Sequence, residues 1–358
     1  GGGGGGGGGP RFAGSSPILR AMEPQFRFCT SADGARISYA VYGSGPPLLY
    51  ASVFWTSRDA QFTQGESRAF MDALAARMTL VTFDRRGTGA SARDVDDLSP
   101  AAEADDIEAV ADAAGLRMFT LLTVFDCLAA AAHYAIGHED RIHRVVLWGT
   151  HTGVSSDWIR TVREDWSVAR RIWAGLVYPE GPISRQRAFS QEVKENVSSE
   201  MAARRFEAFN QVDFAALLPA VTAPTLVLAR EEPVAARQRV MSLARLLPNA
   251  EVRFVPGVDA APFTMHQPIV EAIEQFMGLH DPGLGDPGGG TAVILFTDIV
   301  DSTALTERLG DAAFRAASRT LDERLRGAIR GSGGAPVDGK VLGDGVMAVF
   351  SSAAQAID

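Results

Sequence analysis

Between residues 26 and 279, short apolar runs alternate with segments of helical spacing, and this alternation restricts the fold more than any other feature of the sequence. The runs at 47–52, 80–83, 119–124 and 145–148 are almost continuously apolar. Strands of this kind are buried on both faces, which in a strand–helix–strand order means a parallel sheet covered by helices on both sides. The sequence therefore predicts a doubly wound, mostly parallel α/β domain.

Changes in composition along the chain suggest where its parts begin and end. Residues 1–24 start with nine glycines and have the composition of a disordered tail. An α/β domain is expected at 25–280, interrupted at about 155–218 by a helical insertion in which aromatic residues occur at helical spacing among arginines. The stretch 281–290, DPGLGDPGGG, is predicted to be a linker, and a second domain is expected at 291–358.

Charge and cysteine content narrow the partners and the compartment. A formal net charge of -9 argues against a nucleic acid partner, because such proteins usually carry a basic surface. Cys29 and Cys127 are far apart, so neither a disulfide framework nor a cysteine metal site is expected, and a cytoplasmic location is the expectation. A membrane span is not expected, because the most apolar stretch, 119–136, contains Asp126 and His133.

Segments of the first domain resemble those of α/β-hydrolases. They are GSGPPLLY at 43–50, DRRGTGAS at 84–91, LLTVFDCLAAAAHYA at 121–135, RVVLWGT at 144–150 and APTLVLAREEP at 223–233. Their order and spacing imply the α/β-hydrolase sheet with a helical cap inserted at the usual place. A pocket beneath such a cap is expected to bind an apolar small ligand.

The residues that the family uses for catalysis are replaced in this chain. The G-x-S-x-G nucleophile turn aligns with residues 123–127, which places Phe125 at the nucleophile position without either glycine. Ala260 stands at the position of the base histidine, and Glu232, near the position of the acid, keeps a carboxylate. A benzyl side chain cannot attack a carbonyl, so the resemblance predicts a pseudo-hydrolase in which hydrolase activity is unexpected.

Two other residues offer ways in which the first domain could still be catalytic. Asp126, one residue out of register, could act as a carboxylate nucleophile, and His266 could act as a displaced base. The alternative interpretation of the chain is therefore an active α/β-hydrolase with an unusual nucleophile and an accessory second domain.

In the second domain, two carboxylates each follow a predicted strand at a sharp change of direction. Asp298 ends an apolar run, and Asp344 lies in the glycine-flanked turn at 343–345. Mg²⁺ prefers oxygen ligands, and two ions held by such carboxylates can activate a hydroxyl and neutralise a leaving phosphate. Backbone N–H groups near Ser302 and Thr303, at a predicted helix start, suit phosphate groups.

FTDIVDST at 296–303 and KVLGDGVMAVF at 340–350 resemble the two metal-binding segments of class III adenylate and guanylate cyclases. The resemblance implies a partial α+β, ferredoxin-like domain with two Mg²⁺ or Mn²⁺ ions, held by Asp298, the Ile299 carbonyl and Asp344. It also implies that Asp298 and Asp344 are catalytic and that Lys340 reads the purine, favouring ATP over GTP. The residues expected to contact the nucleotide are Ile299, Ser302, Thr303, Lys340 and Gly343.

The leading prediction is a signalling nucleotide cyclase that converts ATP to cyclic AMP and pyrophosphate. It would act as a homodimer through its cyclase domain, and the hydrolase-like domain would serve as a sensor or regulator. The chain ends at Asp358, before the segment in which cyclases carry a second purine-reading residue and a transition-state Asn and Arg. The chain as it stands is therefore expected to be inactive.

Overall fold

The computed structural model describes residues 24–63, 65–149, 153–231, 234–279, 293–297, 299, 302–332, 334–336 and 346–350. The glycine tract and the predicted linker at 281–290 lie outside these ranges. The chain divides into two compact units, the first reaching to Gly278 and the second beginning at Leu279.

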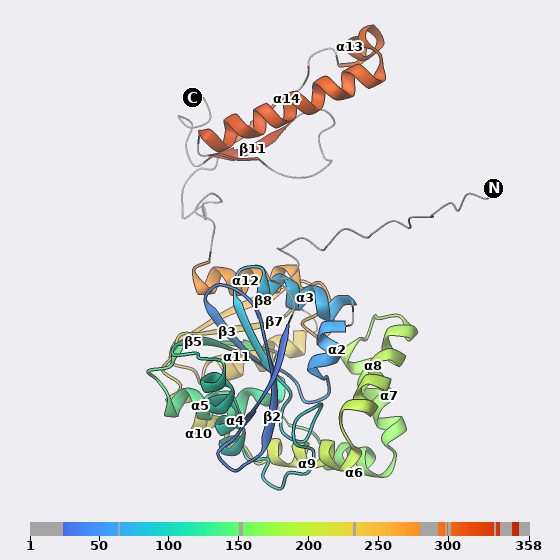
Figure 1. Ribbon diagram of the computed structural model, residues 1–358. Coiled ribbons are helices and arrows are strands. Elements are labelled where there is room, and N and C mark those ends of the chain that lie inside the picture. Colours follow the sequence, from blue (N-terminus) through green and yellow to red (C-terminus); the bar gives the residue numbers. More distant parts are fainter. Residues whose placement is uncertain are drawn as a thin grey trace, which may run out of the picture. The chain divides into compact units, whose positions relative to one another are not determined.

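Eight strands of the first unit form one sheet in the order β1-β2-β4-β3-β5-β6-β7-β8 (Figure 1). β2 is antiparallel to both of its neighbours, and the pairs from β4 through β8 are parallel. The predicted mostly parallel α/β sheet is thus confirmed. The strands are β1 Gln25–Thr30, β2 Arg36–Gly43, β3 Pro47–Ala51, β4 Thr79–Phe83, β5 Phe119–Val124, β6 Ile142–Trp148, β7 Thr225–Arg230 and β8 Ala250–Val255.

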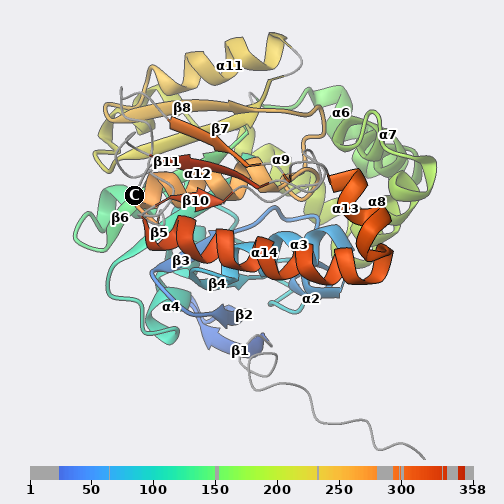
Figure 2. The same cartoon turned by 90° about the horizontal axis from the view of Figure 1, so that it is seen from above.

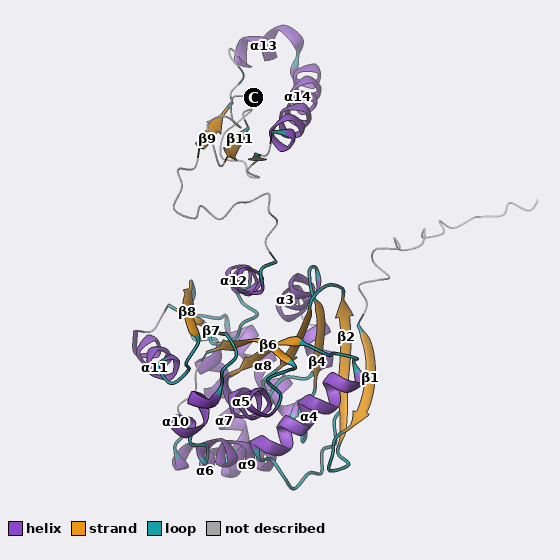
Figure 3. Cartoon of the chain, turned by 90° about the vertical axis from the view of Figure 1, so that its left-hand side faces the viewer, coloured by secondary structure: helices purple, strands orange, loops and turns teal. Residues whose placement is uncertain are grey.

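Helices cover both faces of this sheet (Figure 3). α4 (Pro100–Ala113), α5 (Leu128–Gly137) and α11 (Val234–Ala244) pack on one face, and α3 (Gly65–Ala75) and α12 (Gln267–Met277) lie on the other. β5 is buried along its whole length, as a continuously apolar strand between two helical layers must be. Shorter helices are α2 (Arg58–Thr63), η1 (Phe125–Cys127) and η2 (Leu218–Ala220).

Local sequence explains where several of these helices begin and end. The Ser99 side chain caps α4 by accepting a hydrogen bond from the Ala102 N–H, and Pro100 occupies the first turn, where no N–H is needed. α12 ends at Gly278, whose positive φ of 73° suits a residue without a side chain.

The part of the chain between β6 and β7 is helical and forms a cap, seen together with the sheet in Figure 2. Its helices are α6 Ser156–Glu164, α7 Trp166–Val177, α8 Ile183–Asn196, α9 Ser199–Asn210 and α10 Phe214–Leu217. α6 packs on α9 and α7 packs on α8. The cap therefore presents two helix pairs, and its inner residues lie above the carboxyl ends of the central strands.

The described residues of the second unit form a small antiparallel sheet in the order β10-β11-β9 and two helices. Its elements are β9 Val293–Phe296, α13 Ser302–Leu309, α14 Asp311–Gly331, β10 Ala335–Pro336 and β11 Met347–Phe350. Ile329 of α14 is buried in a cluster with Ala348 and Phe350 of β11. These elements do not by themselves establish the ferredoxin-like cyclase domain that the sequence predicts.

Across both units, every helix that the structure describes is too short or too polar to cross a bilayer.

Gly43, at the end of β2, is predicted to be indispensable for packing. A Cβ atom there would lie 2.3 Å from the carbonyl oxygen of Ala75, and φ is +76°. Gly115 has a similar φ of +72°, but a Cβ there would meet nothing within 4 Å. Gly115→Ala should therefore cost about 1 kcal/mol of backbone strain. Gly43→Ala should cost about 2 kcal/mol more, because packed backbone must move.

Urea unfolding of the two variants measures this difference. Equal losses of unfolding free energy in both variants would mean that the close approach of Gly43 to Ala75 does not matter.

Candidate active site beneath the cap

A strained turn lies at the carboxyl end of β5. The chain leaves Val124 in an extended conformation and turns at once through η1 into α5. Phe125 makes this turn with φ = +44°, and only Met265 among the other described non-glycine residues has positive φ. Such a conformation costs about 1–3 kcal/mol and is concentrated at functional sites. The turn at Phe125 is therefore where a functional site is first sought.

Neighbouring residues fix the ring of Phe125 at this turn. A Cβ on Gly149, just beyond β6, would lie 2.4 Å from the Cε1 atom of the Phe125 ring, so only glycine leaves room for it. The Trp55 ring lies on another side, with centroids 6.0 Å apart. Phe125 thus has the turn geometry of a nucleophile but supplies an apolar wall.

A cavity of about 400 Å³ lies between this turn and the cap. Six of its thirteen lining residues are aromatic, and Asp126 is the one ionisable group among the lining residues that the structure describes. The size and apolar walls suit an uncharged small molecule. The lining residues are Trp55, Phe125, Asp126, Gly153, Val154, Ser155, Trp158, Trp173, Leu176, Val177, Phe206, Phe209 and Ala260.

The two oxygens of Asp126 have different surroundings. Oδ2 accepts a hydrogen bond from Nη1 of Arg85 at 2.5 Å. Oδ1 is buried and has no hydrogen-bond partner within the described part of the chain. A buried carboxylate oxygen without a donor costs free energy unless water or a ligand supplies one. A molecule that brought a hydrogen-bond donor to Oδ1 would therefore remove this cost.

Arg85 belongs to a buried network of four charges that joins the pocket to the cap. Its Nη2 and Nε donate to the two oxygens of Glu103, on α4, at 2.5 and 3.0 Å. Arg205, on cap helix α9, donates to the same carboxylate at 2.7 Å and to the Arg86 carbonyl. With Asp126, two positive charges meet two negative charges, so the network is formally neutral.

The network sets the protonation of its members. Burial alone would raise the pKa of Glu103, but the Arg85 and Arg205 guanidinium groups outweigh it and lower that pKa to about 2. Burial would likewise lower the pKa of Arg85, yet the nearby carboxylates raise it well above its ordinary value. Both groups are therefore charged at neutral pH, and the network positions Asp126 through fixed charges.

Ala260, at the position where the family has its base, is fixed by hydrogen bonds to its backbone. Its carbonyl accepts from Nε1 of Trp148 at 2.8 Å, and its N–H donates to the carbonyl of Val177, at the end of α7, at 2.9 Å. Arg230, at the end of β7, braces the same loop by donating to the carbonyls of Pro256 and three further residues, Asp259, Ala261 and Thr264. This loop is ordered without any catalytic side chain.

Two other residues that could have been catalytic, His266 and Cys127, do not place a reactive side chain in the cavity. His266 starts α12, contacts the Phe263 carbonyl and packs beside the ring of Phe70 on α3, so it does not line the pocket. Cys127 is buried, and burial raises the pKa of its thiol to about 12. A thiolate nucleophile at neutral pH is thereby excluded.

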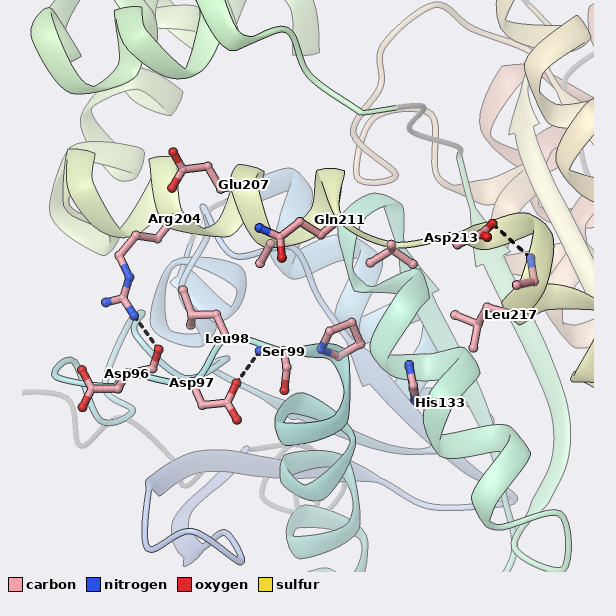
Figure 4. A pocket seen from close by; sticks show the side chains of 14 residues that line it. Asp96, Asp97, Leu98, Ser99, His133, Arg204, Glu207, Gln211, Asp213 and Leu217 are labelled. Atoms are coloured by element: carbon pink, nitrogen blue, oxygen red, sulfur yellow. Dashed lines mark hydrogen bonds between the residues drawn. The ribbon is translucent and has the colours of Figure 1, made fainter.

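A larger surface cleft of about 740 Å³ lies between the start of α4 and the end of α9 (Figure 4). Several of its polar side chains form hydrogen bonds with backbone groups. Arg204 donates to the Val95 and Asp96 carbonyls, and Asp97 accepts from the Ser99 N–H. Asp213 caps α10, and His133 is exposed at the edge. The cavity beneath the cap, with its unsatisfied carboxylate, is the stronger candidate.

The structure brings together three of the predicted site residues, Phe125, Asp126 and Ala260, around one cavity. Ile299, Ser302 and Thr303 are described in the second unit, the last two in the first turn of α13. Outside the described residues lie Glu232, Asp298, Lys340, Gly343 and Asp344. Sequence reasoning missed the ionic partners Arg85, Glu103 and Arg205, whose only visible signal was the DRR run at 84–86.

Comparison with known proteins identifies the fold of the first unit. No family model matches the chain. The putative carbamate hydrolase RutD of Caulobacter sp. (strain K31) is 29% identical over 224 residues, which cover 58% of this chain and 80% of that protein.

Two solved structures illustrate the structural likeness. A hydrolase from Pseudomonas aeruginosa PA01 is 23% identical with a TM-score of 0.61, covering 71% of this chain and 98% of its own. The enol-lactonase from Burkholderia xenovorans LB400 is 16% identical with a TM-score of 0.61, covering 70% of this chain and 100% of its own. The first unit has the α/β-hydrolase fold.

These findings correct the predicted function. The relative and the similar structures are hydrolases, so the prediction of a nucleotide cyclase with an inactive hydrolase domain is wrong. The cyclase prediction depended on two short segments, and their carboxylates Asp298 and Asp344 lie outside the described residues. The expectation that hydrolase activity is absent rested on Phe125, on the two missing glycines and on Ala260. Asp126, which the sequence offered as an alternative nucleophile, has a buried oxygen without a partner in the described residues.

Glu103 is predicted to be essential for stability. Glu103→Gln removes one charge and leaves Arg85 and Arg205 buried with only Asp126, which should cost about 3 kcal/mol of unfolding free energy. Glu207→Gln is the matched control, because Glu207 pairs with Arg163 on the exposed face of the cap and should cost less than about 1 kcal/mol. Chemical denaturation at pH 7 compares the two, and similar small losses would show that the network is not a stabilising element.

The contribution of Glu103 should disappear in acid. Its pKa is lowered from the ordinary 4.5 to about 2 in the folded protein, so its stabilisation is complete above pH 4.5. Below that pH the unfolded chain binds the proton first, and the contribution is lost as the pH falls towards 2. The stability difference between wild type and Glu103→Gln should therefore shrink across this range. A difference that stays constant down to the lowest pH at which the protein folds would contradict the assignment.

Proposed function

We propose that the first unit is a hydrolase of uncharged, largely apolar acyl compounds, such as an ester, a lactone or a carbamate. The observation that carries the proposal is Asp126, the ionisable residue among the described lining of an apolar cavity, whose buried Oδ1 atom has no hydrogen-bond partner in the described residues. The activities in the names of the similar proteins, carbamate hydrolase and enol-lactonase, support an acyl substrate.

The cavity supports a mechanism in which Asp126 acts on water. Oδ1 takes a proton from a water molecule while the water oxygen attacks the acyl carbon, and the bond to the leaving group then breaks. The proton held by Asp126 passes to the leaving group, which restores the carboxylate. General-base assistance of this kind contributes about 10²–10⁴ in rate.

A covalent route is less compatible with the cavity. An acyl or alkyl intermediate on Asp126 would need a second base to activate the water that releases it. Among the described lining residues no other ionisable side chain is present. Direct attack by water needs one carboxylate only, and Arg85 can hold the other oxygen of that carboxylate throughout.

The walls select the substrate. The rings of Trp55, Phe125 and Trp173 offer faces and edges to a flat apolar acyl group, and an anionic substrate would meet the charge of Asp126. Phe125 then serves as a contact surface for the substrate in the place where related enzymes have a nucleophile. We infer a preference for aromatic or branched acyl groups over charged ones.

For the second unit we propose an accessory role. Its cyclase-like segments, binding of two Mg²⁺ or Mn²⁺ ions through Asp298 and Asp344, binding of ATP or GTP through Lys340, and a homodimer stay predictions. The domain limits at 25–280 and 291–358 are likewise retained as predictions.

Asp126→Asn should lower kcat/KM by at least about 100-fold, because the amide cannot take the proton from water. Hydrolysis is measured on 4-nitrophenyl esters with acyl groups from acetyl to benzoyl, on an aryl carbamate and on a lactone. Wild type is expected to turn over at least one class and to prefer the benzoyl ester among the esters.

Ser155→Ala is the matched control, because Ser155 is the other lining residue with a side-chain oxygen. It caps α6, so its loss should cost about 1 kcal/mol of stability yet leave kcat/KM within a factor of two. Loss of turnover in Ser155→Ala with Asp126→Asn unaffected would identify a serine nucleophile and overturn the role of Asp126. Ligand binding by wild type without turnover of any substrate class would overturn the hydrolase proposal itself.

A further inference from the structure

A groove of about 490 Å³ lies between cap helices α7 and α8, apart from the cavity beneath the cap. The two share no lining residue. On α7 the groove residues recur at a spacing of three or four, which places them on one side of the helix, while Trp173 and Val177 line the inner cavity. The groove is lined by Ser167, Arg170, Arg171, Ala174, Ile183, Gln186, Arg187, Ser190 and Gln191.

The charge of this groove is one-sided. Arg170, Arg171 and Arg187 line it, and its described lining contains no acidic residue. These three arginines make no ion pair within the part of the chain that the structure describes. Other cap arginines are paired, such as Arg163 with Glu200 and Glu207. Three unpaired cations on one groove are unexpected in a chain whose formal net charge is -9.

Arg170 is held in place at the wall of the groove. Its Nη1 donates to the carbonyl and the hydroxyl of Ser190, across from it on α8. Its guanidinium carbon lies 5.8 Å from the ring centre of Trp166. Partial burial, and then the charge of Arg171, lower the pKa of Arg170. Like charges are thus kept close together at a cost in free energy, which a bound anion would offset.

We propose that this groove binds the phosphate group of a small organic phosphomonoester. Arginine is suited to such a group, since its planar fork of N–H donors matches phosphate oxygens in pairs. The groove is larger than a bare phosphate ion requires, and Ile183 and Ala174 give it an apolar part for the organic portion of the ligand. Gln186 and Gln191 add further polar side chains along the wall.

Calorimetric titration with phenyl phosphate at low ionic strength tests the proposal on the full chain. The double variant Arg171→Gln, Arg187→Gln should bind at least about 10-fold more weakly, because two charge-assisted contacts are lost. Both side chains are exposed, so the fold should be unaffected. Arg160→Gln is the matched control, since Arg160 is an exposed cap arginine outside the groove, paired with Asp157. It should bind phenyl phosphate as wild type does.

A second readout locates the ligand. Because Trp166 lies beside Arg170, phenyl phosphate should change the tryptophan fluorescence of wild type, and Trp166→Phe should abolish that change while calorimetric binding persists. Benzoate and inorganic phosphate are expected to bind more weakly than phenyl phosphate.

Several outcomes would overturn the proposal. They are equal weakening in Arg160→Gln, unchanged affinity in the double variant, benzoate binding as tightly as phenyl phosphate, or binding to vesicles containing phosphatidic acid without binding to soluble phosphates. The hydrolase proposal is independent, because the double variant leaves the inner cavity intact.

Discussion

The buried network of Asp126, Arg85, Glu103 and Arg205 is the interaction on which the site depends. It is assembled from the turn after β5, the loop after β4, helix α4 and cap helix α9. Each charge would be costly to bury alone, and together they are neutral and hydrogen-bonded. The network therefore joins sheet and cap in a single arrangement and fixes one oxygen of the carboxylate in the cavity.

The sheet could be predicted because each buried strand shows itself in a short run of consecutive apolar residues. A strand such as β5, buried on both faces, is continuously apolar, and it is followed by a helix that covers it. The partners of Arg85 could not be predicted, because Glu103 and Asp126 are 18 and 41 positions away in the sequence. Arginine is also mostly an exposed residue, so its burial could not be expected. Only the packed structure shows that they meet in a buried place.

The error about function has the same origin. The side chains of Phe125 and Ala260 carry no group for the usual chemistry, but the role of their neighbour Asp126 can be judged only from its surroundings. A carboxylate at a helix start is ordinarily solvated, and the sequence does not reveal that one of its oxygens is buried and unsatisfied. The cyclase prediction failed for a different reason. Two short sequence motifs in the second domain were used to predict the function of the whole chain.

The link between Arg205 and Glu103 also affects how fast ligands can enter and leave. Swinging the cap away as one body would separate that ion pair and expose buried charge, so whole-cap opening should be rare. Leu176 lines the inner cavity and is also 66% exposed, so at the end of α7 one side chain lies between the cavity and solvent. A ligand that passed beside Leu176 would leave the Arg205–Glu103 ion pair intact. Residence times should then respond to the size of the side chain at position 176.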